Sequence, residues 1–191
     1  MASPNWDSLS VELSKRLDDA AATASTNGDV WSTTQRDIPL NDACKQLMAK
    51  YWAQGELDFF RSLVESDGQA MTSNEIALSS FSGGVFRIIS ARNGTTVVKP
   101  LPVDWVEDVG SHSLISWYDA GTNNQYYHIE SGNLVNIGGA ATDTMTLRYI
   151  KNWTNLTAGN ATDIPIPPAY FPEVIQLALA NALAETGKVT A

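Results

Sequence analysis

The stretch that decides the fold runs from Tyr126 to Ala184 and passes from short strand-like segments to a helix through a proline-rich turn. Its parts, in chain order, are Tyr126-Tyr127-His128-Ile129, Asn133-Leu134-Val135, Met145-Thr146-Leu147-Arg148-Tyr149-Ile150, Asp163-Ile164-Pro165-Ile166-Pro167-Pro168 and the apolar run from Tyr170 to Ala184. The prolines keep the chain extended, and Pro172 suits the first turn of a helix. The helix beyond it is too apolar to be stable in isolation, so the sequence predicts that it packs against a partner.

Two further helices are expected near the N-terminus. Asp7 or Ser8 can cap the first, and leucines at 9, 13 and 17 fall on one of its faces. The second is expected to begin at Leu40-Asn41-Asp42 and to carry an amphipathic stripe made of Cys44, Leu47, Met48, Tyr51 and Trp52. Its apolar face is expected to continue through Phe59, Leu63 and Val64 until Asp67-Gly68 ends it.

The central part of the chain has the pattern of short strands. The expected strands are Val85–Ile89, Thr95–Val98, Ser113–Tyr118, Gln125–Ile129 and Thr144–Tyr149. Asn93-Gly94 and Ser131-Gly132 are hairpin signals between such runs. The sequence therefore predicts an α+β fold, in which a helical bundle (two N-terminal helices plus a C-terminal helix) carries an inserted small antiparallel β domain.

The expected division follows from this pattern. Residues 1–70 form the N-terminal helices, residues 71–155 form the antiparallel β insert, and residues 156–191 form the proline-rich loop and a C-terminal helix that packs back on the N-terminal helices.

Composition excludes several classes of function. The 191 residues are 43% hydrophobic and 17% charged, so the chain can bury a core. The net charge of −9 argues against a broad phosphate-binding surface. Cys44 is the only cysteine, so the chain has no internal disulfide, and no apolar run reaches the roughly 20 residues that span a bilayer. We expect neither a signal peptide nor a membrane partner.

No active site emerges from the motifs. The two histidines, His112 and His128, have no metal-ligand spacing, and Cys44 lies on an expected core face. Phosphate-binding loops and nucleophile elbows are absent from the sequence. The densest acidic cluster, Asp104-Trp105-Val106-Glu107-Asp108, is most simply a solvated turn. We therefore expect no catalytic, cofactor-binding or metal-binding residues, no cofactor, and a protein that is not an enzyme.

Several segments taken together resemble the head–tail adaptor (connector, or head-completion) proteins of tailed bacteriophages. The segments are Asp37-Ile38-Pro39-Leu40-Asn41-Asp42-Ala43, Leu101-Pro102-Val103-Asp104, Tyr126–Leu134 with its aromatic pair and turn, Leu147–Trp153 with Leu156-Thr157, and Asp163–Pro167 before Tyr170-Phe171. The resemblance covers most of the chain and is strongest from Tyr126 to Ala184.

This resemblance implies a structural protein of the virion neck, present in the host cytoplasm before assembly. Such proteins form a homo-oligomeric ring, usually of twelve subunits, beneath the portal protein. The ring extends the DNA channel, lets double-stranded DNA pass without specific binding, and meets tail or nozzle proteins.

Two sets of candidate residues follow from the resemblance. Apolar residues of the C-terminal segment are candidates for either core packing or interface contact: Tyr170, Phe171, Ile175, Leu179 and Leu183. Asp104, Glu107 and Asp108 are candidates for an electronegative lumen that does not retain DNA, although they equally suit a solubilising surface.

Two alternative functions stay open at this point. The first is a tail-terminator or tail-nozzle ring, which the sequence barely distinguishes from an adaptor. The second is a carbohydrate-binding β module, because the expected strands are rich in aromatic residues such as Trp117 and Tyr118.

Overall fold

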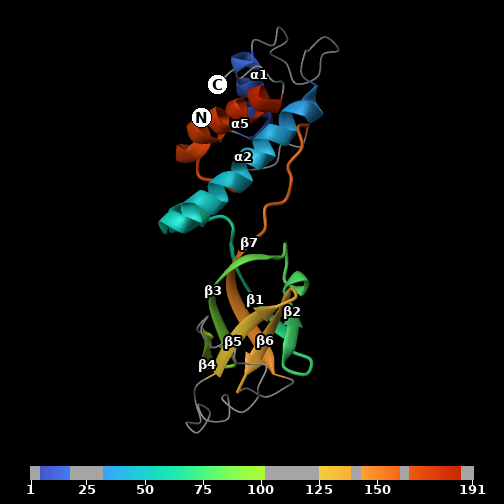
Figure 1. Ribbon diagram of the computed structural model, residues 1–191, viewed down its shortest axis with the longest axis vertical. Coiled ribbons are helices and arrows are strands. Elements are labelled where there is room, and N and C mark those ends of the chain that lie inside the picture. Colours follow the sequence, from blue (N-terminus) through green and yellow to red (C-terminus); the bar gives the residue numbers. More distant parts are fainter. Residues whose placement is uncertain (1–4, 18–31, 102–124, 139–142, 160–163, 186–191) are drawn as a thin grey trace. The chain divides into compact units, whose positions relative to one another are not determined.

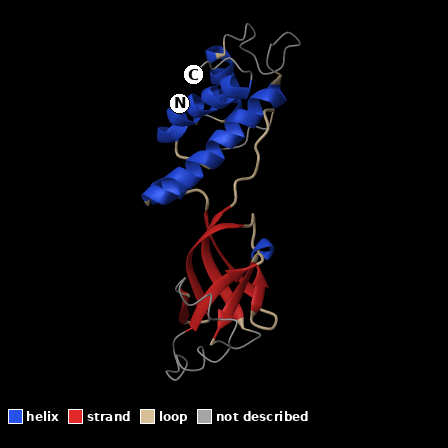
Figure 2. Ribbon diagram, viewed as in Figure 1, coloured by secondary structure: helices blue, strands red, loops and turns tan. Residues whose placement is uncertain are grey.

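A computed structural model describes residues 5–17, 32–101, 125–138, 143–159 and 164–185 (Figure 1). The chain divides into two compact units, and it crosses from one to the other twice. The helical unit comprises residues 1–63 and 153–191, and the β unit comprises residues 64–152. In Figure 2, the α-helices belong to one unit and the strands to the other. The boundaries expected from the sequence lie a few residues further along at each crossing.

The described part of the helical unit contains three α-helices and two short 3-10 turns. They are α1 (Trp6–Arg16), α2 (Thr33–Gln54), η1 (Leu57–Phe60), η3 (Pro168–Tyr170) and α5 (Phe171–Glu185). Asn5, one position before Trp6, caps α1 by accepting a hydrogen bond from the Ser8 backbone N–H. Within the unit, α5 lies alongside α2 (Figure 1).

Helix α2 differs from its expected bounds at both ends. It begins at Thr33 because Ser32 and Gln35 form a capping box that satisfies two backbone N–H groups. It ends at Gln54, where Gly55 adopts a left-handed conformation with φ of 73°. The expected continuation through Val64 to Asp67-Gly68 is wrong, because Val64–Ala70 forms a β-strand instead.

The β unit is one seven-stranded sheet. Its strands are β1 (Val64–Ala70), β2 (Glu75–Ala77), β3 (Val85–Asn93), β4 (Thr96–Pro100), β5 (Gln125–Glu130), β6 (Asn133–Ile137) and β7 (Thr144–Lys151), with the 3-10 turn η2 (Leu78–Ser80) between β2 and β3. Their spatial order is β1-β7-β3-β4-β5-β6-β2. The two outermost strands are consecutive in sequence, and the turn between them contains a bridge from Thr72 to Glu75, so the sheet is nearly closed.

Both expected hairpins are present, each with its own turn. Strands β3 and β4 pair up to Asn93 and Thr96, and Gly94 in the turn has φ of 57°. Strands β5 and β6 meet across Ser131-Gly132, where both residues have positive φ. Two consecutive left-handed residues suit the right-handed twist of the flanking strands.

The expected fold class is wrong. The β structure is not a small antiparallel insert in a helical bundle: it dominates the molecule, and the sheet is mixed. Val98–Pro100 of β4 runs parallel to Gln125–Tyr127 of β5, whereas every other strand pair is antiparallel. A parallel pair requires a long connection, which the 24 residues 101–124 supply. The expected strand Ser113–Tyr118 lies outside the described residues.

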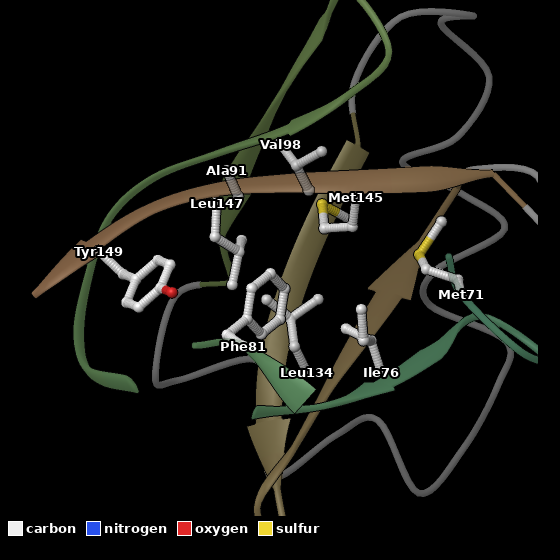
Figure 3. Packing of buried hydrophobic residues seen from close by; sticks show 9 residues of the cluster. All are labelled: Met71, Ile76, Phe81, Ala91, Val98, Leu134, Met145, Leu147 and Tyr149. Atoms are coloured by element: carbon white, nitrogen blue, oxygen red, sulfur yellow. The ribbon is translucent and has the colours of Figure 1, made fainter. Parts of the chain in front are cut away.

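One apolar cluster fills the β unit. It consists of Met71, Ile76, Phe81, Ala91, Val98, Leu134, Met145, Leu147 and Tyr149 (Figure 3). The Phe81 and Tyr149 rings meet edge to face with centroids 5.5 Å apart. The Tyr149 hydroxyl donates to the Ser82 carbonyl at 3.0 Å, so the buried ring keeps a polar partner.

Candidate functional site

Three of the five candidate interface residues pack against other residues of the helical unit. Phe171 and Ile175 are buried, and Tyr170 is half-buried. The Tyr170 ring packs edge-on against Tyr51, with centroids 4.9 Å apart, and against Phe59, with centroids 5.1 Å apart. Phe171 and Ile175 therefore lie in the core of their own unit, whereas Tyr170 is packed on one side and also lines an open groove.

The other candidates are placed differently. Leu179 and Leu183 are half-buried on α5, beside the fully buried Ala178 and Ala182. Their partial exposure keeps them as candidates for contact with another subunit. The acidic candidates, Asp104, Glu107 and Asp108, lie outside the described residues.

A charged anchor fixes the beginning of α5 to the end of α2. The Glu173 carboxylate accepts hydrogen bonds from the Lys50 ammonium group and from the Tyr51 hydroxyl. The hydrogen bonds from Lys50 and then Tyr51 hold the pKa of Glu173 below its ordinary value. Burial, followed by the hydrogen bond to Glu173, raises the pKa of Tyr51 to about 12. Glu173 is therefore an anion bound by two donors.

The most concentrated polar site of the helical unit is centred on Asn41. Its side-chain oxygen accepts from the Trp153 indole N–H at 2.8 Å and from the Leu156 backbone N–H at 2.9 Å. Its amide nitrogen donates to the Leu156 carbonyl at 2.9 Å and to the Asp37 carbonyl at 2.8 Å. Asn41 is 4% exposed, so one buried side chain uses both ends of its amide to hold a segment more than 100 residues away.

The Asp37 carboxylate, one turn earlier on α2, extends this network. One oxygen accepts from the Trp6 indole N–H at 2.8 Å, and the other accepts from the Ala158 backbone N–H at 3.0 Å. Asp7 on α1 accepts from the Gly159 backbone N–H at 2.8 Å. We call the set of Trp6, Asp7, Asp37 and Asn41 with residues 153–159 the clasp.

The clasp joins α1, α2 and the chain that returns from the β unit. Its hydrogen bonds are directional and largely shielded from water, which makes them geometrically specific. The centroids of the Trp6 and Trp153 rings also lie 6.4 Å apart. Asp37, Asn41, Trp153 and Leu156 all lie in segments of the family resemblance, but the sequence does not indicate their contacts. The sequence signal that could have indicated the clasp is the presence of two indole donors, Trp6 and Trp153, and two short polar side chains, Asp37 and Asn41.

An open groove lies between η1 and the chain that leads into α5. It has a volume of about 560 Å³, and its lining comes from η1 and from the chain leading into α5: Asp58, Arg61, Ser62, Ile164, Ile166, Pro167, Pro168, Ala169, Tyr170 and Phe171. Asp58 and Arg61 form an exposed ion pair at 3.9 Å at this groove. The site offers apolar and aromatic contact rather than a set of catalytic groups.

The chemistry of the described residues agrees with this description. Within those ranges, no group of three or more His, Cys, Asp and Glu side chains is arranged to hold a metal ion. Burial raises the pKa of the Cys44 thiol to about 12, which disfavours the nucleophilic thiolate. Among the helices that the structure describes, none has the length and apolar character needed to cross a membrane.

No protein-family model matches the chain, and no curated protein matches it significantly.

Proposed function

We propose that the chain is the subunit of a head–tail adaptor ring that binds beneath the portal of a tailed bacteriophage, extends its DNA channel and joins head to tail. The clasp is the observation that carries the proposal. Two segments on which the family resemblance rests, Asp37–Ala43 and Leu147–Thr157, supply its central hydrogen bonds. A coherent local structure at these segments supports the idea that they form one functional element.

The architecture supports a structural role for physical reasons. A ring subunit must keep its shape while DNA moves past it and while its neighbours pull on it. The clasp and the Tyr51–Glu173 hydrogen bond join distant parts of the helical unit by partly buried hydrogen bonds. Such bonds fix a geometry as well as adding stability.

The proposed assembly surfaces consist of exposed or half-buried apolar residues rather than the buried residues of α5. Ile38 on α2 and Leu57 in η1 are 49% and 57% exposed, and both belong to the helical unit. Val97 and Ile129, in the β unit, are 52% and 54% exposed. We propose that Ile38 and Leu57, with Leu179 and Leu183, contribute to ring or portal contacts, and that Asp104, Glu107 and Asp108 make the lumen electronegative.

The decisive experiment is electron microscopy of the purified protein mixed with the portal ring of the same phage. We expect an additional ring of density on the portal, with DNA-channel continuity. A chain that stays monomeric and leaves the portal unoccupied at micromolar concentration contradicts the proposal. Assembly on tail tubes, with the portal left bare, would instead favour the tail-terminator or nozzle alternative.

Paired variants identify the docking unit. Ile38→Glu combined with Leu57→Glu should abolish ring formation, because buried apolar contacts would become unpaired charges. Val97→Glu combined with Ile129→Glu is the matched control, with equally exposed residues on the β unit. If only the control pair prevents assembly, the ring contacts belong to the β unit.

The carbohydrate-binding alternative has less support among the described aromatic residues. Trp6 is fully buried, Trp153 donates to Asn41, and Trp52 packs edge-on against Phe60 with centroids 6.2 Å apart. These rings serve internal packing, whereas glycan platforms present exposed faces.

A further inference from the structure

Two asparagines of the β unit are joined by a backbone hydrogen bond. Asn136 on β6 is 2% exposed, and its backbone N–H donates to the Asn74 carbonyl at 2.8 Å. Asn136 follows Leu134 by two positions, and alternate residues of a strand share a face. Leu134 is a fully buried member of the apolar cluster, so Asn136 places a carboxamide on the core face.

Three side-chain amide atoms of this pair have no hydrogen-bond partner among the described residues. Asn136 Oδ1, Asn136 Nδ2 and Asn74 Oδ1 are all buried, and none has a hydrogen-bond partner in the part of the chain that the structure describes. Asn93, another buried asparagine of the same unit, differs because it donates to Gln125 Oε1 at 3.0 Å. Buried polar atoms are nearly always paired, so the three atoms indicate a hydrogen-bonding group that the described residues do not supply.

The surroundings define the chemistry of that group. Asn136 is paired across the sheet with Tyr127, and burial raises the pKa of Tyr127, so the phenol stays neutral. The nearest acidic residue in sequence, Glu75, is exposed, and its carboxylate accepts from the Asn133 amide at 3.3 Å. A cation would require more oxygen ligands and compensating charge, and an anion would require basic groups. The group is therefore small, neutral and able both to donate and to accept.

We propose that Asn74 and Asn136 hold a buried water molecule, which donates to the two Oδ1 atoms and accepts from Asn136 Nδ2. One water supplies both donors and the acceptor that the three amide atoms need, and buried waters typically make about three such bonds. The water connects the turn between β1 and β2 to strand β6. Because β2 pairs with β6 over only three residues, this bridge fixes the register at which the sheet nearly closes.

The test counts long-lived internal waters by oxygen-17 magnetic relaxation dispersion on the full chain. Asn136→Leu keeps the branching at Cγ and removes both polar atoms, so it should lose one long-lived water relative to the wild type. Asn133→Leu, on the same strand but outside the buried amide pair, is the matched control and should lose none. Equal counts in the wild type and a folded Asn136→Leu protein would overturn the proposal.

A second measurement needs no variant and decides the question if Asn136→Leu fails to fold. In the wild type, the Asn136 side-chain NH₂ protons should show nuclear Overhauser cross-peaks to water with the sign of a long-lived complex. A high-resolution crystal structure should place a water within hydrogen-bond distance of both Oδ1 atoms. A protein group bonded to these amide atoms in its place would refute the water site.

Discussion

The two units hold distant parts of the chain together by different means. In the helical unit, the segment 153–159 is fixed by side chains, above all by the single amide of Asn41 and the single carboxylate of Asp37. In the β unit, distant strands are joined by backbone ladders, such as the seven paired positions of β1 and β7, over an apolar cluster. The side-chain network depends on a few atoms, whereas the ladder is redundant and depends on core volume.

This contrast predicts where each unit is vulnerable. Removal of one polar side chain should destabilise the helical unit. The β unit should be destabilised mainly by the loss of a large core side chain. The following predictions test that difference in order of decreasing effect.

The largest effect is expected from Phe81→Ala in the β unit. Phe81 is 1% exposed and packs against Tyr149, so truncation leaves a cavity and should cost about 4 kcal/mol of unfolding free energy. Urea unfolding, combined with hydrogen exchange of β6 and β7 peptides, measures this loss of unfolding free energy. Ile129→Ala, at a 54% exposed site of the same sheet, should change stability by about 0.5 kcal/mol or less. Similar losses in the two variants would show that the core is not where the unit's stability lies.

Asn41→Ala should destabilise the helical unit by about 3 kcal/mol, because it leaves the Trp153 indole N–H and both Leu156 backbone groups without their partner. Hydrogen exchange should accelerate in residues 153–159. The neighbouring Asp42→Ala removes only an exposed ion pair with Lys45 at 3.6 Å and should cost about 0.5 kcal/mol or less. If the segment 153–159 stays protected in Asn41→Ala, the clasp does not hold it.

A glycine pair separates backbone strain from crowding within the β unit. Gly84 has φ of 67°, and a Cβ there would lie 2.6 Å from Asn152 Nδ2, whereas Gly94 has φ of 57° and open space around it. Gly84→Ala should cost about 2 kcal/mol and Gly94→Ala about 1 kcal/mol, since both are strained but only the first must displace a side chain. Thermal unfolding of both variants checks the order, and a larger loss at Gly94 would contradict it.

The smallest effect is the pH dependence of the Glu173 anchor. The folded-state pKa of Glu173 lies below its ordinary value of 4.5, so its stabilisation is fully present above that value and is lost as the pH falls through the folded-state pKa. Glu173→Gln should remove this acid-sensitive contribution, which is about 1 kcal/mol for a partly exposed ion pair. Urea unfolding of the helical unit from about pH 7 to about pH 3 measures it.

Glu12→Gln is the control for this titration, because Glu12 pairs with Arg16 on the exposed face of α1. Its stability should follow that of the wild type across the range. An unchanged acid slope in Glu173→Gln would mean that Glu173 does not anchor α5.

Local signals were sufficient for part of the fold and misleading for another part. The helix after the prolines, the leucines of α1 and the two hairpins were correct because periodicity and turn residues act over a few neighbours. The cap expected at Asp7 or Ser8 was wrong, because Asn5 caps α1. Val64–Ala70 was assigned to a helix end because Leu63 and Val64 continue an apolar spacing. The strand forms because its backbone pairs with β7, about 80 residues later, which no local pattern encodes.

The candidate interface residues show the same difference between local signals and contacts made by distant parts of the chain. The sequence identified Tyr170, Phe171 and Ile175 as apolar residues that must be buried, but it left open whether by their own unit or by a partner. In the structure, Tyr170 contacts Tyr51 and Phe59, which lie more than 100 residues away in the chain.

The sequence by itself determined the helical and strand segments with strong local signals, the acidic balance, and the lack of a recognisable catalytic motif. Only the tertiary structure decided that β4 and β5 run parallel, that seven strands make one nearly closed sheet, and that Asn41 and Asp37 fasten the returning chain. The physical reason is that strand direction and buried hydrogen bonds depend on which distant groups meet, whereas propensity and periodicity depend only on neighbours.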